Sequence, residues 1–583
     1  MKPLAFILFL ALCGTLWSQT LNASDEKFLG LWGAEQMYGP IVRGELTIDT
    51  REKEWHAYIG GFDAVVEHHE QQLRFRLAGD QGEFRGRFTT EKKQIVGQWI
   101  QAPGFTLNQR YASPVRLEEL VAGVWRGVVA PLDSRITFFL MIDRKGDGSA
   151  GAYIRNPEHN WFGRGTYALS TSGTTITLKR GEQQLQGRYD AESDSLLFGL
   201  VDGAPPLRFT RRKREEALGL VPRLAVLAYR WQQPIDENDG WRTSSLTEVR
   251  LDPKPLAELV GKILAADPAE NGLNIQSLLI ARHGKLVLEE YFYGFSGDRP
   301  HDMRSASKTF APMLVGIARD QGAKISAEEP VLSFFPQYAS IANMEDRKRK
   351  MTLGDLMNMA SGLCDDRDPK SGEDAMQNQT DQADWYKYAL DLPMRKDPGG
   401  RDAIYCSSNL NLVGGAVRHA TGRWLPDFFD EFVAQPLQFR NFYMNLMPTG
   451  EAYMGGGLYL RPRDQLKVGQ VYLAGGVWNG KRVLGRQWVK ESLQERTSFV
   501  SMGDFDPPIH GYGYGWHTRT LKAGNKTFRD YYMGGNGGQN VIILPELDMV
   551  VVFSGGNYGE ARKFFRWESE LLPQYIIPAV TGQ

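Results

Sequence analysis

Short runs in which apolar and polar residues alternate fill the chain from about residue 24 to residue 212. Two examples are Leu73-Arg74-Phe75-Arg76-Leu77 and Thr175-Ile176-Thr177-Leu178, and Gly, Asp and Ser turns separate such runs. Alternation with a period of two is typical of strands that bury one face. The pattern predicts that residues 24–212 form an all-β region of short antiparallel strands.

The β-rich region also repeats itself. Three segments return in the same order, and the pairs are Gly30-Leu31-Trp32 with Gly123-Val124-Trp125, Ala57-Tyr58-Ile59 with Ala152-Tyr153-Ile154, and Phe84-Arg85-Gly86-Arg87-Phe88 with Leu185-Gln186-Gly187-Arg188-Tyr189. We interpret this order as a duplication, with repeats at about 24–115 and 116–212. Each repeat is expected to form a small antiparallel barrel or half of one larger barrel.

The pattern changes after the repeats. A charged stretch at 211–216 and the Pro-containing segment after it predict a linker over residues 213–245. From residue 246 to residue 583, helical and strand patterns mix. Strands are expected at 277–281 and 286–288 around a hairpin turn, and at 540–544 and 549–553 around a second turn.

A serine and a lysine stand one helical turn apart where an apolar helix begins. Ser305 and Lys308 share one helix face, so the amine can reach the hydroxyl. The apolar positions after them have helical spacing and are Phe310, Met313, Leu314 and Ile317. Pro312 inside this run predicts a kink or an irregular turn. The pair indicates a serine nucleophile with a lysine base, and the alternative is a helix-capping serine followed by a surface lysine.

Composition and the N-terminal residues bear on partners and location. The chain has 583 residues, 42% of them hydrophobic, and a formal net charge of −1, so neither nucleic acid nor an anionic membrane surface is an expected partner. Met1-Lys2 and the apolar run after it indicate a signal peptide over residues 1–23. No later segment is apolar enough for a membrane span. The mature protein is therefore expected to be periplasmic or extracellular, and its oligomeric state is left open.

No motif predicts a cofactor or a metal. Residues 146–151 fit G-x-G-x-x-G, but no helix follows them, so a hairpin turn is expected there. His56, His68 and His69 lack the spacing of metal ligands and are interpreted as ordinary histidines.

Residues from about 250 to 583 resemble the serine β-lactamase and penicillin-binding-like superfamily. The matching segments follow the family's order: His283-Gly284-Lys285; Arg304-Ser305-Ala306-Ser307-Lys308; Thr352-Leu353-Gly354-Asp355-Leu356 with Ser361-Gly362-Leu363; Tyr405-Cys406-Ser407; Gly455-Gly456-Gly457-Leu458-Tyr459 with Arg463-Asp464; Tyr512-Gly513-Tyr514-Gly515-Trp516; and Gly537-Gly538-Gln539. The resemblance is greatest to the class C branch, which includes family VIII carboxylesterases and 6-aminohexanoate-dimer-hydrolase-like amidases. It implies an α/β (α+β) domain with a mainly antiparallel sheet flanked by helices. Together with the barrel-like repeats before it, this domain makes the expected chain multidomain.

The resemblance also implies roles for individual residues. Ser305 is the expected nucleophile, Lys308 its activator and Tyr405 the second proton carrier. Lys308 and Tyr405 are expected to titrate as a coupled pair, and which of them takes the proton is left open. The backbone N–H groups of Ser305 and Gln539 are the expected oxyanion hole.

Two departures from the family's motifs bear on the substrate. Ser407 stands where the Y-x-N motif has its Asn, and Asn409 is a candidate to replace that amide. Asn536-Gly537-Gly538 takes the place of K-T-G and lacks the cation that helps to hold the carboxylate of a β-lactam. Ser407, Asn536, Gly537 and Gly538 are the expected substrate-binding residues.

Two cysteines remain once Cys13 leaves with the signal peptide. Cys364 and Cys406 form either one disulfide or two buried thiols. Both adjoin elements that the resemblance assigns to the active site, because Cys364 follows the 361–363 loop and Cys406 follows Tyr405. On that ground we predict a disulfide that fixes Tyr405.

The function expected from these observations is that of an exported serine hydrolase that cleaves a small ester or amide through an acyl-enzyme at Ser305. One alternative is a D-amino-acid peptidase or β-lactamase that acts on cell-wall-like substrates, which the missing cation disfavours. The other is a non-catalytic binding protein on a hydrolase fold, which the joint presence of Ser305, Lys308 and Tyr405 disfavours.

Overall fold

The structure is a computed structural model. It describes residues 23–37, 41–90, 93–103, 109–133, 135–146, 148–162, 165–200, 205–224, 228–266, 273–379, 383–499 and 510–581. Residues 1–22, which include Cys13 and nearly all of the expected signal peptide, lie outside the described residues. No helix within the described ranges combines the length and the apolar character that a membrane crossing requires.

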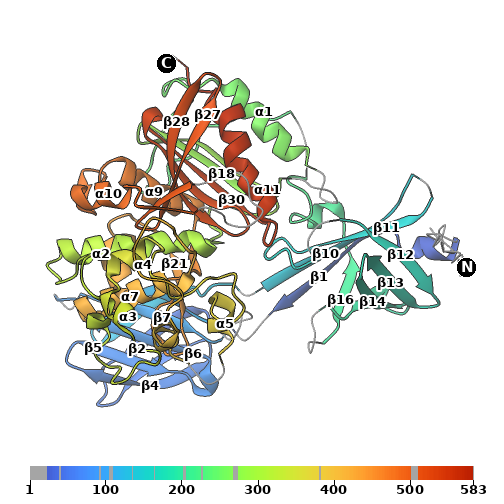
Figure 1. The fold of residues 1–583 in the computed structure, drawn as a ribbon. Helices are drawn as coiled ribbons and strands as arrows, with labels where there is room; N and C mark the ends of the chain where they lie inside the picture. Colours follow the sequence, from blue (N-terminus) through green and yellow to red (C-terminus); the bar gives the residue numbers. More distant parts are fainter. Residues whose placement is uncertain are drawn as a thin grey trace, which may run out of the picture.

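The N-terminal region forms two β-barrels, as the alternating pattern predicts (Figure 1). Its strands are β1 (Gly30–Met37), β2 (Gly44–Asp49), β3 (Trp55–Ile59), β4 (Phe62–His69), β5 (Gln72–Arg76), β6 (Gly82–Phe88), β7 (Gln94–Gln101), β8 (Arg110–Val121), β9 (Val124–Val129), β10 (Arg135–Arg144), β11 (Ala150–Arg155), β12 (Tyr167–Ser172), β13 (Thr175–Arg180), β14 (Gln183–Asp190), β15 (Ser195–Phe198) and β16 (Leu207–Arg211). The first barrel contains β2 to β9 and closes because β9 pairs with both β2 and β8. The second contains β1 and β10 to β16 and closes because β1 pairs with both β10 and β16.

The two barrels have exchanged their first strands. The repeated segments of the sequence lie on β1 and β9, on β3 and β11, and on β6 and β14, so each strand corresponds to the strand eight positions later. Nevertheless β1, from the first repeat, closes the second barrel, and β9, from the second repeat, closes the first. Each exchanged strand carries a tryptophan into its host core, where Trp32 and Trp125 are buried. The boundary expected near residue 115 falls inside β8.

The C-terminal domain is built on a mainly antiparallel sheet, as expected. Its strand order is β17-β19-β18-β30-β29-β28-β27-β26-β25, and only β17 pairs in parallel among the described residues. The strands are β17 (Arg242–Thr243), β18 (Ile275–Arg282), β19 (Lys285–Tyr291), β25 (Thr497–Phe499), β26 (His510–Gly513), β27 (Trp516–Ala523), β28 (Lys526–Gly535), β29 (Gln539–Leu544) and β30 (Met549–Gly555). Helix α1 (Pro253–Leu264), α11 (Ala561–Arg566) and the π-helical η8 (Trp567–Ile576) cover one face, and α9 (Pro462–Leu473) covers the other.

A helical layer lies between this sheet and the first barrel (Figure 1). It contains η4 (Arg304–Thr309), α2 (Phe310–Asp320), α3 (Asp346–Lys350), α4 (Leu353–Met357), α5 (Glu373–Gln377), α6 (Trp385–Asp391), α7 (Ser407–Thr421) and α8 (Leu425–Phe429), whereas α10 (Arg486–Ser492) lies beside α9. Pro312 causes no kink, because residues 304–309 form a 3₁₀ turn and the α-helix begins only at Phe310. Pro312 thus occupies the first turn of α2, where a backbone N–H has no intrahelical partner to lose.

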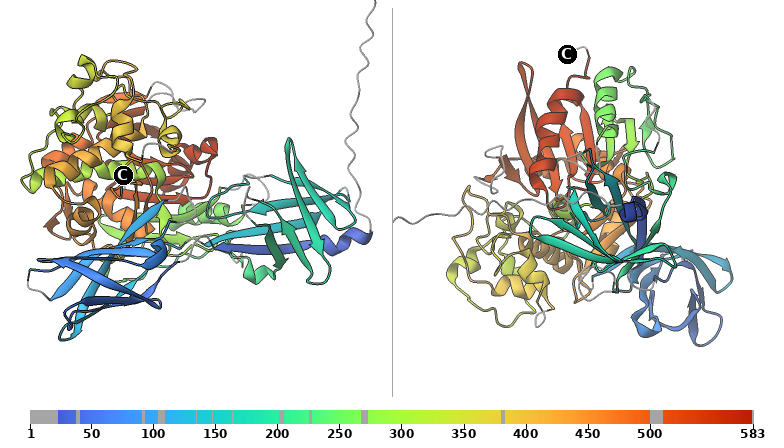
Figure 2. Two further views of the ribbon diagram at one scale, coloured as in Figure 1. Left: turned by 90° about the horizontal axis from the view of Figure 1, so that it is seen from below. Right: turned by 90° about the vertical axis from the view of Figure 1, so that its right-hand side faces the viewer.

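The first barrel is joined to the C-terminal domain by strand pairing. Strand β8 pairs with β21 (Phe442–Leu446), which pairs with β22 (Leu458–Leu460), which pairs with β20 (His301–Asp302). A further small hairpin is formed by β23 (Val477–Trp478) and β24 (Lys481–Arg482). The second barrel stands apart from the helical layer and projects in another direction (Figure 2). The barrel edge therefore continues into β20, three residues before Ser305.

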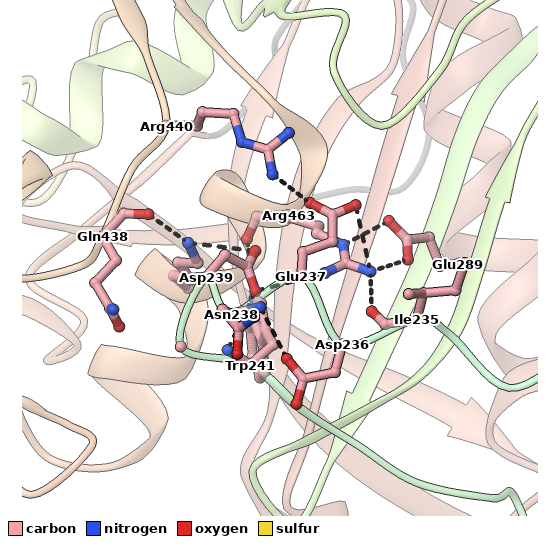
Figure 3. A network of polar contacts seen from close by, with 12 residues as sticks. Ile235, Asp236, Glu237, Asn238, Asp239, Trp241, Glu289, Gln438, Arg440 and Arg463 are labelled. Atoms are coloured by element: carbon pink, nitrogen blue, oxygen red, sulfur yellow. Dashed lines mark hydrogen bonds and ion pairs between the residues drawn. The ribbon is translucent and has the colours of Figure 1, made fainter.

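Part of the expected linker is tightly bound to the C-terminal domain. We call residues 229–243 the strap. Trp231 donates its indole N–H to the Val287 carbonyl at 2.8 Å, and Arg242–Thr243 adds β17 to the sheet edge. Glu237 and Asp239 of the strap lie among cationic side chains of the domain, as Figure 3 shows for Arg440 and Arg463. The segment is thus an integral part of the domain surface rather than a free connection.

Candidate active site

Ser305 lies on a tight turn between β20 and α2. The residue before it, Arg304, has a left-handed backbone with φ 48°, a conformation that is costly for a residue with a side chain. Asp302 stabilises this turn, because its Oδ1 accepts the Arg304 backbone N–H at 2.8 Å and its Oδ2 lies 2.9 Å from Arg304 Nε. The strained turn projects Ser305 at the start of the nucleophile helix.

Lys308 reaches back to Ser305, as its spacing predicts. Its Nζ donates to Ser305 Oγ at 3.0 Å and to the Gly455 carbonyl at 2.5 Å. The lysine is buried, with 2% of its surface exposed. The segment that contains Gly455 makes a second contact with the serine turn, because the Leu458 backbone N–H donates to Ser307 Oγ at 3.1 Å. The two family segments around Ser305 and Gly455 therefore come together in space.

Tyr405 completes the group. Its ring centroid lies 5.0 Å from Lys308 Nζ. Burial raises the pKa of Tyr405, and the nearby Lys308 and a hydrogen bond with Ser305 offset this effect only in part. Burial alone would lower the pKa of Lys308, but Tyr405, Glu373 and Asp366 outweigh it and hold that pKa above its ordinary value. Both residues consequently keep their protons at neutral pH.

Two acidic residues behind Lys308 were not predicted from the sequence. Asp366 and Glu373 surround the hydroxyl of Ser407, whose Oγ lies 2.5 Å from Asp366 Oδ2 and 3.1 Å from Glu373 Oε2. Glu373 also accepts a hydrogen bond from the Tyr453 hydroxyl. Burial, together with the charge of Glu373, raises the pKa of Asp366 to about 6. No sequence spacing links these carboxylates to Lys308, because they lie on a loop and a short helix about 60 residues further along the chain.

The expected substrate-binding role of Ser407 is wrong. Its backbone N–H donates to both carboxylate oxygens of Asp366 at 3.0 Å, and its hydroxyl is engaged by the same acidic pair. Asn409 does not replace the missing amide either, because it is fully buried and its Oδ1 accepts from Ser361 Oγ at 2.7 Å. Both side chains stabilise the protein around Tyr405 and leave no free polar group for a substrate.

Cys364 and Cys406 are joined by a disulfide, with their Cα atoms 5.3 Å apart. The Asp366 backbone N–H donates to the Tyr405 carbonyl at 2.9 Å. The disulfide and this hydrogen bond together fasten the loop that carries Asp366 to the start of α7. Tyr405 and Asp366 are thus held on the same side of Lys308.

The glycines expected to line the substrate site lie elsewhere. Asn536, Gly537 and Gly538 form the turn between β28 and β29, where Asn536 Oδ1 accepts the Gly559 N–H at 2.9 Å. A Cβ atom on Gly537 would meet the ring of Tyr558, and one on Gly538 would meet Trp567. The turn therefore packs against residues that follow β30 rather than against Ser305.

Gly535 is the residue of this hairpin that contacts the nucleophile turn. A Cβ atom there would lie 2.3 Å from the Met303 carbonyl oxygen and 3.1 Å from the Ala306 nitrogen. Gln539 pairs with Gly535 across the hairpin, and its side-chain amide donates to the Gly555 carbonyl at 2.6 Å. Because the matching glycines of the sequence stand so close together, the family motif could not be placed on Gly535 without the structure.

An aromatic wall lies beyond Tyr405. Phe499 is 6.0 Å from Tyr405 between ring centroids, and His517 is 5.8 Å from Phe499. Burial lowers the pKa of His517 well below its ordinary value, so its ring is neutral. The segment after Tyr512 also contacts the nucleophile helix, because Thr309 Oγ1 donates to the Gly515 carbonyl at 2.7 Å.

Other candidates from the sequence are structural. Lys145 and Ser149 close the expected hairpin connection between β10 and β11, because the Lys145 N–H donates to the Ser149 carbonyl at 2.7 Å. His56 hydrogen-bonds Asp63 at 2.8 Å, and His68 stacks on Trp55. Across the part of the chain that the structure describes, no group of three or more His, Cys, Asp or Glu residues is arranged to hold a metal ion.

Residues 262–572 match the family model described as Beta-lactamase. The chain belongs to the β-lactamase family. A curated relative, the 6-aminohexanoate-dimer hydrolase of Paenarthrobacter ureafaciens, is 27% identical over 288 residues, which are 47% of this chain and 71% of the relative. Two solved structures are similar to the chain: a family VIII carboxylesterase (16% identity, TM-score 0.38, 50% of this chain and 90% of that one) and a D-stereospecific amidohydrolase from Streptomyces (17% identity, TM-score 0.38, 50% and 94%).

Membership of the β-lactamase family agrees with the site. The matched residues include Ser305, Lys308 and Tyr405, and they end within η8. The protein is therefore a serine hydrolase of the β-lactamase family, similar to a protein named as a 6-aminohexanoate-dimer hydrolase.

Proposed function

We propose that the protein is an exported enzyme that hydrolyses a small ester or amide through an acyl-enzyme at Ser305. The observation that supports this most directly is the 3.0 Å hydrogen bond from Lys308 Nζ to Ser305 Oγ, next to the buried Tyr405. A serine hydroxyl becomes a nucleophile when a neighbouring group accepts its proton. Lys308 and Tyr405 supply that group as a coupled pair.

The proposed reaction has two halves. The Lys308–Tyr405 pair first loses one proton to solvent. Ser305 Oγ then attacks the carbonyl carbon while its proton passes to the pair, and the pair returns that proton to the leaving alcohol or amine. Water then attacks the acyl-enzyme, gives its proton to the same pair and releases the acid, after which Ser305 regains its proton. The negative oxygen that forms in each half is bound by the Ser305 backbone N–H and by a backbone N–H of the Gly535–Gln539 strand pair.

The chemistry around β28 supports an ester or amide rather than a β-lactam. The strand that ends beside Ser305 reads Tyr532-Met533-Gly534-Gly535 and carries no cation at this end. A substrate with a carboxylate at this position would lack its ionic partner. The curated relative, named as a hydrolase of 6-aminohexanoate dimer, supports an amide.

Labelling at Ser305 tests the enzyme proposal. Purified full-length protein, Ser305→Ala and the neighbouring control Ser307→Ala are treated with a fluorophosphonate and assayed with p-nitrophenyl esters and nitrocefin. We expect labelling and ester turnover in the wild type and in Ser307→Ala, and neither in Ser305→Ala. Equal labelling of Ser305→Ala would refute the assignment of the nucleophile, and efficient nitrocefin turnover would refute the substrate ranking.

Export is supported by the pattern of the first residues and by the disulfide, because disulfides persist in oxidising compartments. N-terminal sequencing of protein recovered from the periplasm or medium tests this part. A mature N-terminus between residues 18 and 25 is expected. Recovery of the chain only in the cytoplasm, with residue 1 intact, would contradict it.

A further inference from the structure

A cavity lies where both barrels meet the C-terminal domain. It has a volume of about 520 Å³ and is lined from β8 of the first barrel, from β1 and β10 of the second barrel, and from β20, β21 and β22 of the C-terminal domain. Cavities of about 300–1,000 Å³ suit small ligands. Ser305, Lys308 and Tyr405 do not line it. Both barrels and the C-terminal domain thus contribute to its walls.

The walls combine tyrosine rings with paired charges. The rings are Tyr111, Tyr443, Tyr459 and Tyr558, and Tyr111 meets Tyr459 edge to face at 5.4 Å. Between them, Arg299 pairs with Glu158 at 3.1 Å. Such a wall offers apolar ring faces beside hydrogen-bonding groups whose charges already neutralise one another. An ionic ligand would have to break these pairs, whereas a neutral polar ligand would not.

One buried polar atom of the wall has no partner. His301 is only 2% exposed, its ring stacks on Phe295 at 4.5 Å, and its Nε2 has no hydrogen-bond partner among the described residues. Burial lowers the pKa of His301 to about 3, so the ring is neutral. An unpaired buried nitrogen costs free energy, and a ligand hydroxyl recovers it when the His301 ring turns Nε2 toward the cavity that this residue lines.

We propose that this cavity binds a neutral oligosaccharide, two or three sugar rings long. A sugar ring has apolar C–H faces, which suit the tyrosine rings, and a rim of hydroxyl groups, which suit the Arg299–Glu158 pair and His301. A flat aromatic ligand would leave these polar groups without partners, and a charged ligand would have to displace the existing ion pairs.

The occupied cavity acts on the nucleophile turn. Asp302 and Tyr558 line the cavity, and both also contact Arg304. Asp302 accepts the Arg304 backbone N–H and pairs with its guanidinium, which lies over the Tyr558 ring at 5.0 Å from the ring centroid. Arg304 in turn holds the left-handed backbone beside Ser305. A sugar that contacts Asp302 or Tyr558 therefore changes the position of Ser305 and the rate of ester hydrolysis.

Filling the cavity without touching the catalytic residues tests the proposal. Thr137 of β10 lines the cavity, and Thr177 of β13 occupies a similar half-exposed outward position elsewhere on the same barrel. Full-length wild type, Thr137→Trp and the control Thr177→Trp are titrated by calorimetry with chitotriose, cellotriose and maltotriose. Turnover of p-nitrophenyl acetate without sugar shows that each variant is folded.

We expect the wild type and Thr177→Trp to bind at least one of these sugars, and Thr137→Trp to bind it at least tenfold more weakly while keeping its basal ester hydrolysis. Saturating sugar should change kcat at least threefold in the wild type and not in Thr137→Trp. Absence of binding to all three sugars would overturn the ligand class. Equal binding by Thr137→Trp would overturn the location, and an unchanged kcat at saturation would overturn the coupling to Ser305.

Discussion

The Ser407 hydroxyl lies 2.5 Å from a carboxylate oxygen of Asp366, whose charge also acts on Lys308. Ser407 thus binds the acidic residues near Lys308, whereas its position in the Y-x-N motif had suggested that it would bind a substrate. Asp366 raises the pKa of Lys308 and that of Tyr405, so it holds both proton carriers in their protonated forms.

Replacing Asp366 should make the enzyme active at lower pH. The base must lose a proton before it can accept one from Ser305, so kcat/KM should rise with pH through the neutral range. In Asp366→Asn the negative charge is gone and the pKa of both Lys308 and Tyr405 falls, so this rise should begin at lower pH. The measurement is kcat/KM for p-nitrophenyl acetate against pH. Asp365→Asn is the control, because that carboxylate pairs with Arg367 instead, and an identical shift in both variants would contradict the role of Asp366.

A methyl group on Gly535 should slow catalysis with little change in the fold. Its Cβ would lie 2.3 Å from the Met303 carbonyl, so β28 or the nucleophile turn must move. A displacement of about 1 Å at a reacting group costs about 100-fold in rate, so kcat of Gly535→Ala should fall by about that factor. Gly261→Ala on α1, where a Cβ meets nothing within 4 Å, is the control. A Gly535→Ala enzyme with wild-type kcat would refute this contact.

Removing the disulfide should loosen the site. Cys364 and Cys406 are 42 residues apart in sequence, and a cross-link over a loop of that length stabilises a protein by about 2–4 kcal/mol. The pair of substitutions Cys364→Ser and Cys406→Ser should lower the free energy of unfolding by that amount and also lower kcat, because Tyr405 and Asp366 are no longer fastened together. Mass spectrometry after alkylation of the unreduced wild type gives the control, and two alkylated thiols there would contradict the bond.

The strap should be needed for stability of the C-terminal domain. Asp239 lies 3.4 Å from Arg463 and 3.6 Å from Lys467, and both cations are buried. Arg463 keeps Glu289 and Lys467 keeps Asp464 as closer partners. Asp239→Asn therefore weakens one contact of each cation and should lower the unfolding free energy of this domain by about 1.5–3 kcal/mol, the range for a hydrogen bond to a charged group. Asp236→Asn is the control. It also removes one negative charge from the strap, but Asp236 accepts the Asn238 backbone N–H and does not contact these cations (Figure 3). Equal destabilisation by both variants would show that the ion pairs do not matter.

Deleting β1 should open the distant barrel. A chain that begins at residue 41 lacks the strand that pairs with β10 and β16, whereas the barrel of β2 to β9 keeps all its strands. Limited proteolysis should therefore cut within residues 135–211 and spare residues 44–129. Protection of both barrels would contradict the exchange, and cleavage in the first barrel alone would support the simple order of repeats.

The sequence predicted local features well. The strands of the repeats, the hairpin around Gly284 and the contact of Lys308 with Ser305 all depend on residues that are close together in the chain, where periodicity and spacing carry the information. The disulfide followed from the family resemblance, because only two cysteines remained and both adjoined site elements.

The rest depends on contacts between distant segments. Nothing local in β1 distinguishes pairing with its own repeat from pairing with β10 and β16, since either arrangement buries the same face. Likewise Ser407 has the same neighbours in sequence whether it faces a substrate or Asp366. The position of Gly535 was missed because several glycines lie close together in this segment. What distinguishes Gly535 from its neighbours is its close packing against the Met303 carbonyl, which only the structure shows.

The exchange of first strands also imposes an order of folding on the growing chain. Strand β1 leaves the ribosome first, but its second partner, β16, ends at Arg211. At about 5–20 residues per second, the chain needs about 10–35 s to extend from the end of β1 to that point. During this interval β2 to β9 can close the first barrel, while β1 has no partner until β10 is made and lacks its second partner until β16 is made. The first strand made is thus one of the last to be fully paired, and the second barrel can close only after the first has all its strands.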